Sequence, residues 1–381
     1  MRTQVAIVGG GPAGLMLGRL LELRGIDTVI LETRDREYVQ QRVRAGVLEQ
    51  ATMDLMDEVG LGERMHREGL VHHGVELRFA GERHRIPLSE LTGGRAITIY
   101  GQQEVVKDLI AARLESGLPL YFEVSDVSVD PETPRVQFTH EGERHTLDCD
   151  LIAGCDGFHG VCRPAIADQL TVYTREYPFG WMGILAECPP ASDELIYCHH
   201  ERGFALASLR SPKITRMYLQ CEPDEEPWED EAIFQELDTR FGMRVNRGRV
   251  LEKGVTPMRS FVVEPMQHKH LYLAGDAAHI VPPTGAKGLN TAMADVYLLA
   301  HSIGDDAKLA AYSETALKRV WRVQHFSWWM TSMLHRFKRD DAFQMRLQLS
   351  QLLYTTTSRA QATALAENYV GMPFATSYQD A

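Results

Sequence analysis

The sequence feature that most constrains the fold is a glycine motif near the N-terminus. Gly9, Gly11 and Gly14 follow the apolar run QVAIV at residues 4–8 and directly precede the apolar segment LMLGRLLELRG, which ends at Gly25. Another apolar run, DTVILE, then ends at Glu32. This order predicts a strand, a helix and a second strand, which is how a doubly wound parallel sheet begins.

The spacing of the three glycines predicts a dinucleotide site at the start of the helix. In such a motif Gly9 makes the turn, Gly11 lets the backbone approach a pyrophosphate, and Gly14 lets the helix pack on the strand. The free N–H groups of the helix N-terminus face the phosphates, and Glu32 can accept hydrogen bonds from a ribose. A purely structural turn is the alternative interpretation.

Two later runs favour FAD over NAD as the dinucleotide. CDGFHGVCR (155–163) and LAGDAAH (273–279) both follow an apolar strand and place an aspartate beside a glycine. Flavoprotein hydroxylases carry elements of this kind, and the aspartate of the second one reaches the ribityl chain. Taken singly each run could be a turn, but with the glycine motif they make three nucleotide-type elements.

A different pattern fills residues 70–100 and 170–220, where alternation predicts antiparallel strands in a second, sheet-rich region. If FALASLR (204–210) and RMYLQ (216–220) form a hairpin, the strand period of two lets Ser208, Arg210 and Tyr218 meet. A guanidinium with two hydroxyls suits a carboxylate. An arginine that simply faces water at the hairpin end is the alternative. From residue 290 onward the pattern is helical.

Composition excludes several classes of partner. A formal net charge of -12 argues against binding to nucleic acid or to an anionic membrane. The six cysteines form no CxxC pair, so no metal site is predicted, and their number suits reduced thiols in a cytoplasm. No apolar run reaches the roughly 18 residues of a membrane span, and the N-terminus lacks the layout of a signal peptide. We therefore expect a cytoplasmic protein.

Longer stretches along almost the whole chain resemble one family. They include RVRAGVLEQ (42–50), YGQQEV (100–105), YPFGW (177–181), LAGDAAHIVPPTGAKGLN (273–290), FSWWMTSMLHRF (326–337) and AENYVG (366–371). Through them the chain resembles the group A flavoprotein aromatic hydroxylases. The resemblance implies a Rossmann-like FAD domain (1–70, 95–170 and 255–290) interleaved with an antiparallel-sheet substrate domain (71–94 and 171–254). It also implies a helical region, 291–381, that contributes to a homodimer.

The FAD contacts that the resemblance implies lie at positions spread over most of the chain. They are Gly9, Gly11, Ala13, Gly14, Glu32, Arg42, Val43, Arg44, Ala45, Gly46, Val47, Gln102, Asp276, Leu289 and Asn290. Arg42 and Arg44 can neutralise the diphosphate charge. Ala13 stands where some members have a serine, which removes a possible hydroxyl contact but leaves the backbone N–H.

The nicotinamide cosubstrate is expected to bind transiently, because the chain has no second motif of the GxGxxG type. The resemblance implies contacts at Arg34, Tyr38, His159 and Arg259. Arg34 favours a 2′-phosphate, whereas Asp35 opposes one, and Thr33 replaces an arginine of strictly NADPH-using members. We expect NADPH, with NADH as the alternative.

The resemblance also implies a site for an aromatic acid, lined by Tyr197, Ser208, Leu209, Arg210, Tyr218 and Pro283. Arg210 with Ser208 and Tyr218 would hold the carboxylate. Tyr197, Tyr369 and His72 would carry the phenolic proton to solvent, although the adjacent His73 leaves the histidine open. Pro283 and Thr284 would lie near the ring, and Lys287 is expected to act near the flavin as a lone cation, mobile or electrostatic in role.

The activity that the resemblance implies is hydroxylation of 4-hydroxybenzoate to 3,4-dihydroxybenzoate. NAD(P)H would reduce FAD, and O2 would form a flavin hydroperoxide that attacks the ring ortho to the phenol. Another hydroxybenzoate or an aminobenzoate is the nearest alternative substrate. A flavin-binding oxidase or redox regulator without hydroxylation, or a plain NAD-dependent dehydrogenase, would be a protein of another class.

Overall fold

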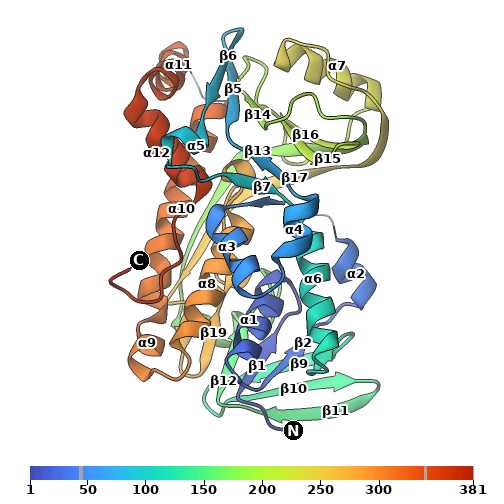
Figure 1. Ribbon diagram of the computed structural model, residues 1–381, viewed down its shortest axis with the longest axis vertical. Coiled ribbons are helices and arrows are strands. Elements are labelled where there is room, and N and C mark those ends of the chain that lie inside the picture. The colour runs from blue at the N-terminus through green and yellow to red at the C-terminus, as the bar shows by residue number, and fades with distance from the viewer. Residues whose placement is uncertain (43–45, 339–340, 381) are drawn as a thin grey trace.

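The structure is a computed structural model that describes residues 1–42, 46–338 and 341–380. One end of the molecule holds a sheet in the order β18-β19-β12-β1-β2-β8 (Figure 1). Its strands are β1 (Val5–Val8), β2 (Thr28–Leu31), β8 (Leu120–Tyr121), β12 (Leu151–Gly154), β18 (Gln267–His268) and β19 (Leu271–Leu273). All pairings are parallel except β18 with β19. The predicted strand-helix-strand opening is confirmed.

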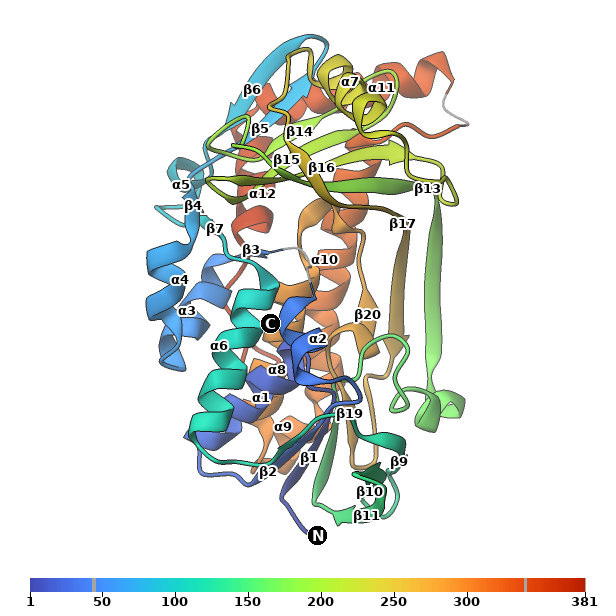
Figure 2. The same ribbon diagram turned by 90° about the vertical axis from the view of Figure 1, so that its right-hand side faces the viewer.

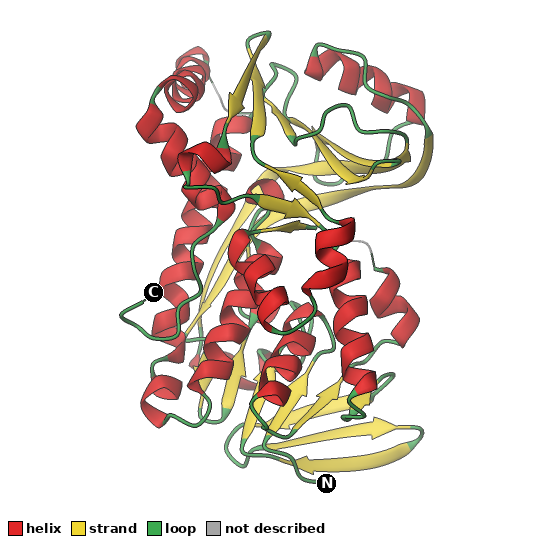
Figure 3. Ribbon diagram, viewed as in Figure 1, coloured by secondary structure: helices red, strands yellow, loops and turns green. Residues whose placement is uncertain are grey.

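Helices cover this sheet because its central strands are apolar on both faces. Every residue of β1, β2 and β12 is buried, as expected for a parallel sheet between helical layers. Figure 3 shows the helices gathered around these strands. They include α1 (Pro12–Leu23), α2 (Arg36–Gln41), α3 (Gln50–Glu58), α4 (Gly62–Glu68), α6 (Gln102–Glu115) and α8 (Gly288–Ser302). Helix α1 packs against both α6 and α8.

The other end of the molecule is built on a sheet in the order β20-β17-β13-β16-β15-β14-β5-β6. The strands are β5 (Val75–Phe79), β6 (Glu82–Ile86), β13 (Thr171–Glu187), β14 (Ile196–Cys198), β15 (Ala205–Ser211), β16 (Ile214–Cys221), β17 (Arg249–Glu264) and β20 (His279–Ile280). The pairings are antiparallel except β14 with β5. The predicted antiparallel sheet, and with it the mixed α/β fold class, is confirmed.

Strands β13 and β17 connect the two ends of the molecule, as Figure 2 shows along its right-hand side. They pair from Thr171↔Glu264 to Glu187↔Arg249, with irregularities in register between Glu176 and Gly180 and between Leu185 and Ala186. The predicted domain boundary between residues 254 and 255 falls inside β17. The helix α7 (Asp230–Phe241) packs beside the far end of this sheet.

The C-terminal region is helical, with α9 (Asp306–Ala310), α10 (Tyr312–Leu334), α11 (Ala342–Thr357) and α12 (Arg359–Val370). The long helix α10 runs between the two ends of the molecule beside α8. Smaller elements are α5 (Leu88–Leu91), the sheet of β3 (Val47–Leu48), β7 (Ile97–Ile99) and β4 (Leu70–His72), and the sheet of β9 (Ser125–Asp130), β10 (Arg135–His140) and β11 (Glu143–Asp148).

The buried apolar side chains form three clusters: one around the parallel sheet, one where the eight-stranded sheet meets α10 and α12, and one beneath α7. The six cysteines are buried and unpaired. Within the described ranges, no helix combines the length and apolar character that a membrane crossing requires.

Candidate functional site

The glycine motif forms a turn in which added side chains would clash at two positions and not at the third. A Cβ on Gly9, where φ is +108°, would lie 2.3 Å from the carbonyl oxygen of Cys155. A Cβ on Gly14 would lie 1.9 Å from the carbonyl oxygen of Gly9. At Gly11 a Cβ would meet nothing within 4 Å. Gly9 and Gly14 are therefore required by the fold itself, whereas Gly11 faces open space where a pyrophosphate would approach.

Glu32 is fixed at the end of β2 beside this turn. Its Oε2 accepts a hydrogen bond from the Gly10 N–H over 2.7 Å, and its Oε1 accepts one from the Arg34 N–H over 2.8 Å. The carboxylate is only partly buried, so its remaining lone pairs can accept from a ribose. Helix α1 has no acidic residue in its first turn and no side-chain cap, which leaves its N-terminal N–H groups for an anion.

Further predicted FAD positions converge on the same side of the parallel sheet. A Cβ on Gly46 would lie 2.5 Å from Gly101 Cα, directly before Gln102 at the start of α6. Asn290 Nδ2 donates to the Val47 carbonyl over 2.9 Å, and Asn290 Oδ1 accepts from the Glu49 N–H over 2.9 Å. Segments that are far apart in the sequence are thus held together at the N-terminus of α8. Leu289 lies there too and is half-buried.

A buried histidine–aspartate pair holds the Gly275–Asp276 turn. Asp295 Oδ2, on α8, accepts from the Gly275 N–H over 2.9 Å and lies 2.6 Å from His279 Nε2. Burial by itself would lower the pKa of His279, but the Asp295 carboxylate outweighs it and the pKa is raised. Gly275 also comes close to Ala13 and α8, and Asp276 is exposed beyond it. The sequence reading missed Asp295.

These features fit FAD: a turn open at Gly11, an oriented carboxylate at Glu32, and the facing N-terminal ends of α1 and α8. The predicted positions Val43, Arg44 and Ala45 lie outside the described residues. Arg42 is exposed at the end of α2.

The predicted nicotinamide residues form two small aromatic groups. Arg34 and Arg42 lie over the Tyr38 ring, with their guanidinium carbons 5.1 and 5.7 Å from its centroid. On the other group, Arg259 lies 5.0 Å over the Phe158 ring, which makes an edge contact with His159 at 5.0 Å. Sequence reasoning did not single out Phe158. Arg34 and Arg42 are exposed and Arg259 is half-buried, so these positive charges remain open to an anionic ligand.

Two buried tyrosines meet between the eight-stranded sheet and the C-terminal helices. The hydroxyls of Tyr197, on β14, and Tyr369, on α12, lie 2.5 Å apart, and both side chains are only 1% exposed. Burial raises the pKa of each phenol above its ordinary value. Both groups therefore stay protonated near neutral pH and can donate as well as accept a hydrogen bond.

The β15–β16 hairpin brings the predicted carboxylate clamp together. Register places Leu206 opposite both Tyr197 and Tyr218, and Ser208 opposite Arg216, so these side chains share one face. The register shifts between Leu209 and Ser211, so that a bulge sets the direction of Arg210, a detail that strict alternation does not predict.

Arg210 is the unusual member of this group because its guanidinium is enclosed without a full set of partners. Within the described residues its Nε and Nη1 are buried and make no hydrogen bond. Burial lowers the pKa of Arg210, and Tyr218 partly offsets the shift. Ser208 is buried beside it, and Leu209 is buried with its side chain directed to the other face of the strand. A buried cation with unused donors calls for an anion.

Gly183 explains how the Tyr218 ring is placed. It lies opposite Tyr218 on β13, and a Cβ there would come within 3.1 Å of the Tyr218 ring carbon Cε1. The Trp181 ring lies on the same strand, 4.9 Å from the Tyr218 ring.

The loop Pro283–Ala286 lies between α10 and the N-terminus of α8. Thr284 is fully buried, and its Oγ1 lies 2.9 Å from Thr331 Oγ1. Pro283 is exposed, and its carbonyl oxygen accepts a hydrogen bond from the Ala286 N–H over 2.9 Å. Ala286 itself has a positive φ of 55°, which makes the loop turn into α8.

Lys287 is not the lone cation that the sequence suggested. Its Nζ lies 2.6 Å from Glu49 Oε1, and it also donates to the carbonyls of Asn368 and Tyr369. Burial lowers the pKa of Lys287, and Glu49 opposes that change. A lysine in an apolar loop requires a buried partner, but the sequence cannot say that Glu49, 238 residues away, supplies it.

His72 differs from the expected solvent-facing group. It ends β4 opposite Ile97 of β7 and is 1% exposed, whereas His73 is exposed and lies 2.9 Å from Ser89 Oγ. Burial lowers the pKa of His72 to about 4. Among the described residues neither ring nitrogen of His72 has a hydrogen-bond partner. The strand pairing thus turns His72 inward and leaves both nitrogens available to a small polar molecule.

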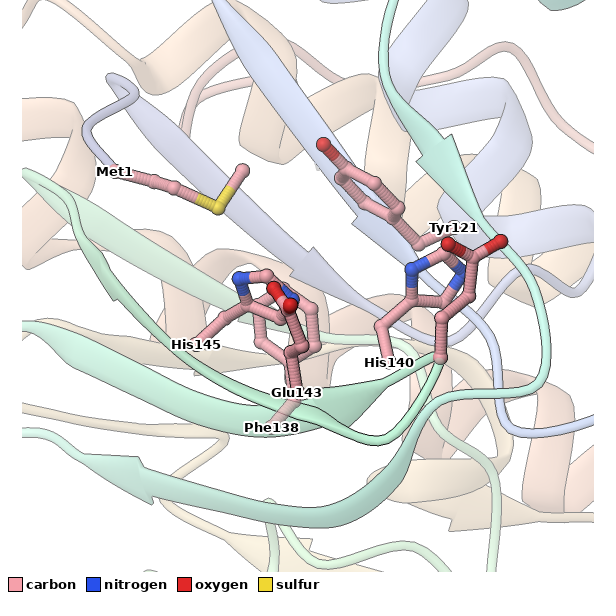
Figure 4. A pocket seen from close by; sticks show the side chains of 7 residues that line it. Met1, Tyr121, Phe138, His140, Glu143 and His145 are labelled. Carbon is pink, nitrogen blue, oxygen red and sulfur yellow. The ribbon is translucent and has the colours of Figure 1, made fainter.

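Two pockets lie outside this site. One, of about 230 Å³, is formed by Met1, Tyr121, Phe138, His140, Glu141, Glu143 and His145 on the β9–β11 side of the molecule (Figure 4). The other, of about 330 Å³, lies between β13, β17 and α10 and includes Trp321 and Trp328. Neither is lined by a residue of the predicted site.

Comparison with known proteins identifies the family. Residues 2–327 match the model of the FAD binding domain family. The chain is 46% identical to p-hydroxybenzoate hydroxylase from Acinetobacter baylyi, over 98% of this chain and 96% of the relative. It is 26% identical to rifampicin monooxygenase from Rhodococcus hoagii, over 78% of this chain and 63% of that protein.

Solved structures share the fold. p-Nitrophenol 4-monooxygenase from Pseudomonas putida superimposes with a TM-score of 0.82 at 18% identity, covering 97% of this chain and 99% of that one. Aklavinone-11 hydroxylase, solved with FAD and aklavinone, superimposes with a TM-score of 0.73 at 17% identity, covering 87% and 69%. The glycine turn and the oriented Glu32 agree with the sequence similarity along almost the whole chain. This chain belongs to the FAD binding domain family and is an FAD-dependent aromatic hydroxylase that uses NAD(P)H and O2.

Proposed function

We propose that this enzyme hydroxylates 4-hydroxybenzoate to 3,4-dihydroxybenzoate. The observation that carries the proposal is the enclosed Arg210 guanidinium with unused donors, on the same sheet as Tyr197 of the buried Tyr197–Tyr369 pair. The 46% identity to a p-hydroxybenzoate hydroxylase supports the same substrate class.

The clamp end of the pocket would bind the substrate carboxylate. Arg210 can donate two parallel hydrogen bonds to the two carboxylate oxygens, and the hydroxyls of Ser208 and Tyr218 can satisfy remaining lone pairs. The anion would also remove the cost of an enclosed cation whose donors lack partners.

The spacing of residues along β15 favours a para arrangement. Leu206, which lies opposite Tyr197, precedes Arg210 by four residues on β15, a span of about 13 Å along the strand. We infer that a tyrosine and an arginine on these two rows bind polar groups at opposite ends of one ring. A meta-hydroxybenzoate held by the same clamp would point its hydroxyl away from Tyr197.

The tyrosine pair would control the phenolic proton. The substrate ring reacts more readily as a phenolate, whereas an unperturbed phenol has a pKa of about 10. Because Tyr197 stays protonated, it can donate to the phenolate oxygen while it accepts a hydrogen bond from Tyr369. Before ionisation the directions are opposite: the phenol donates to Tyr197, and Tyr197 donates to Tyr369. A shift of one proton along each hydrogen bond then ionises the substrate, and Tyr369 passes its own proton onward.

His72 would be the outlet of this path. Its neutral ring can accept a proton on one nitrogen and release one from the other, so its low pKa does not prevent a relay through water. Thr284 would pack beside the ring near the carbon that receives oxygen, with the Pro283 carbonyl on the phenol side.

Bound FAD, reduced by NAD(P)H, supplies the activated oxygen. We assign FAD binding to the glycine turn, Ala13, Glu32, Arg42, residues 43–45, Gly46, Val47, Gln102, Asp276, Leu289 and Asn290. NAD(P)H binding is assigned to Arg34, Tyr38, His159 and Arg259, with NADPH preferred over NADH.

The experiment that tests the function is a product assay with purified holoprotein. NADPH or NADH is supplied with 4-hydroxybenzoate, 3-hydroxybenzoate, 4-aminobenzoate or benzoate, and consumption of NAD(P)H, aromatic product and peroxide are measured together. We expect one 3,4-dihydroxybenzoate per NAD(P)H with the para-hydroxy acid only. A protein without flavin absorbance, or one that forms peroxide without a dihydroxy product, would contradict the proposal.

We further infer a homodimer. Large apolar side chains stand exposed on the end of α10 and on α11: Trp328, Phe343, Met345, Leu347, Leu353 and Tyr354. Of these, Phe343, Leu347 and Tyr354 recur at helical spacing on one face of α11, and an apolar helix face left open in this way is typical of an interface. Light scattering should give the mass of a dimer for the native chain and of a monomer for Phe343→Asp with Leu347→Asp. A monomeric native chain would refute the inference.

A further inference from the structure

Helix α10 is attached to both walls of the proposed substrate pocket. At its C-terminal end the Leu334 carbonyl accepts a hydrogen bond from His199 Nδ1 over 3.1 Å. The adjacent Arg336 backbone exchanges two hydrogen bonds with the Gln220 side chain, at 2.5 and 3.0 Å. One turn before this end, Thr331 contacts Thr284. The same helix therefore touches the sheet that carries the clamp and the loop that carries Thr284.

His335 joins these two attachments. Its Nδ1 lies 3.0 Å from the Thr331 carbonyl oxygen, and its Nε2 lies 2.7 Å from the indole nitrogen Nε1 of Trp181. A carbonyl can only accept and an indole N–H can only donate, so the proton of the neutral ring must be on Nδ1. Burial lowers the pKa of His335 to about 3, which keeps this tautomer over the whole neutral range.

On the loop side, hydrogen-bond directions are also determined. The Thr331 hydroxyl donates to the Ser327 carbonyl over 2.7 Å, which uses its only proton. The Thr284 hydroxyl must then be the donor in its 2.9 Å contact with Thr331. This fixes the orientation of the Thr284 side chain from the helix side.

On the sheet side, Trp181 passes the constraint to the pocket wall. Its ring is stacked on Phe204 at 5.1 Å and lies 4.9 Å from the ring of Tyr218. The His335 ring is itself stacked between Phe179 at 4.7 Å and Phe204 at 4.3 Å, with no exposed surface. A continuous series of contacts thus runs from Thr284 through Thr331, His335 and Trp181 to the clamp residue Tyr218.

We propose that His335 is a positioning residue for hydroxylation. Its two hydrogen bonds set the spacing between the Thr284 loop and the substrate sheet, and so the place of the aromatic ring at the point where oxygen is transferred. The inference rests on the proposed function. A displacement of about 1 Å at a reacting centre can cost on the order of 10²-fold in rate, so a small change of spacing is enough to matter.

The test compares variants that remove one or both hydrogen bonds of His335 with one that restores an acceptor. His335→Phe keeps a stacked ring and removes both hydrogen bonds, and Trp181→Phe removes only the donor to Nε2. His335→Gln restores an acceptor for Trp181. Thr315→Val, which loses a 2.8 Å hydrogen bond elsewhere on α10, is the matched control.

Three results are expected with 4-hydroxybenzoate. The hydroxylation kcat falls about tenfold in His335→Phe, with peroxide rising, while KM changes less than about threefold because the clamp remains. The double variant His335→Phe with Trp181→Phe is no worse than the poorer single variant. His335→Gln recovers part of the coupling, and Thr315→Val behaves as the native enzyme.

A second readout does not depend on the substrate. Hydrogen exchange of the backbone amides in residues 284–287 should speed up in His335→Phe and in Trp181→Phe, and not in Thr315→Val. If exchange and coupling are unchanged in both aromatic variants, or if Thr315→Val loses as much, the positioning role is refuted. If the native enzyme makes no 3,4-dihydroxybenzoate, the proposed function fails, and hydrogen exchange still decides on the spacing role.

Discussion

The end of the molecule around the parallel sheet, here called the nucleotide end, and the end around the eight-stranded sheet, here called the aromatic end, offer different kinds of chemical group to a ligand. At the nucleotide end the groups offered to a ligand are mainly backbone: the turn at Gly11, the N-terminal N–H groups of α1, and a carboxylate held by the N–H groups of Gly10 and Arg34. At the aromatic end they are side chains, the buried Tyr197 and Tyr369 and the partly buried Arg210 and Tyr218, which come from three strands and a helix.

Because of this difference, we expect the two ends to be damaged by different kinds of substitution. A binding site made of backbone groups requires that no side chain blocks the ligand, so adding a methyl group is the damaging change there. A side-chain site needs particular functional groups, so removing one atom is the damaging change there. Each variant below is chosen to affect one end and leave the other unchanged.

The largest effect is expected for Arg210→Ala. Truncating one partner of a buried hydrogen-bonded charge pair costs about 2–5 kcal/mol. We therefore expect kcat/KM for 4-hydroxybenzoate to fall by about 10²- to 10³-fold at unchanged FAD content. Arg249→Ala, which removes an exposed arginine paired with Glu187, is the control and should be silent. A normal kcat/KM in Arg210→Ala would show that Arg210 does not bind the substrate carboxylate.

Tyr197→Phe should come next. The ring remains, so substrate binding should be nearly unchanged, but the proton path loses its first hydroxyl. We expect hydroxylation to slow by about 10²-fold and peroxide to accumulate, as seen by single-turnover absorbance and product analysis. Tyr312→Phe also loses a buried hydroxyl, a 2.8 Å donor to the Leu273 carbonyl, and should hydroxylate normally. Normal hydroxylation by Tyr197→Phe would contradict the relay.

Gly11→Ala tests the nucleotide end. Because a Cβ on Gly11 meets nothing within 4 Å, the FAD-free protein should keep its thermal stability, while a methyl group would obstruct the pyrophosphate. We expect FAD affinity, followed by fluorescence titration, to fall by about tenfold or more. Gly254→Ala, equally open but in β17, is the matched control. Unchanged FAD affinity would show that the phosphates lie elsewhere.

The smallest effects concern two buried histidines with opposite pKa shifts. The pKa of His279, at the nucleotide end, is raised, so its contribution to stability is present below pH 6.5 and is lost as pH rises through the folded-state pKa. The pKa of His72, near the aromatic end, is about 4, so stability falls as pH drops from about 6.5 to 4.

Thermal unfolding between pH 4 and pH 8 checks this difference. Relative to the native chain, His279→Asn should lose Tm mainly at low pH, and His72→Asn should flatten the loss of Tm toward pH 4, each by a few degrees at about 2 °C per kcal/mol. Parallel pH profiles for the two variants would contradict the assigned shifts.

The same difference in construction explains what could be predicted from the sequence. Gly9, Gly11, Gly14 and Glu32 follow one another within a single strand-helix-strand unit, so their spacing predicts the local geometry. The face shared by Ser208 and Tyr218 follows from strand periodicity in one hairpin. Both are short-range patterns.

The contacts that sequence reasoning missed are long-range or depend on an irregularity. The bulge at Arg210, the inward turn of His72 and the Lys287–Glu49 pair have no local signal. Trp181 and His335 are 154 residues apart, and only the packing of α10 on the substrate sheet brings them together. Histidine and tryptophan within aromatic sequence are as compatible with ordinary core packing as with a hydrogen-bonded pair.

The central claim is that one end of the pocket recognises a carboxylate and the other a phenol. The most direct test is a crystal structure of the FAD-loaded protein with 4-hydroxybenzoate. We expect the carboxylate on the Arg210 guanidinium, with Ser208 and Tyr218 in contact, and the phenolic oxygen within hydrogen-bond distance of Tyr197 Oη. A substrate bound in the reverse direction, or one bound away from Arg210, would contradict it.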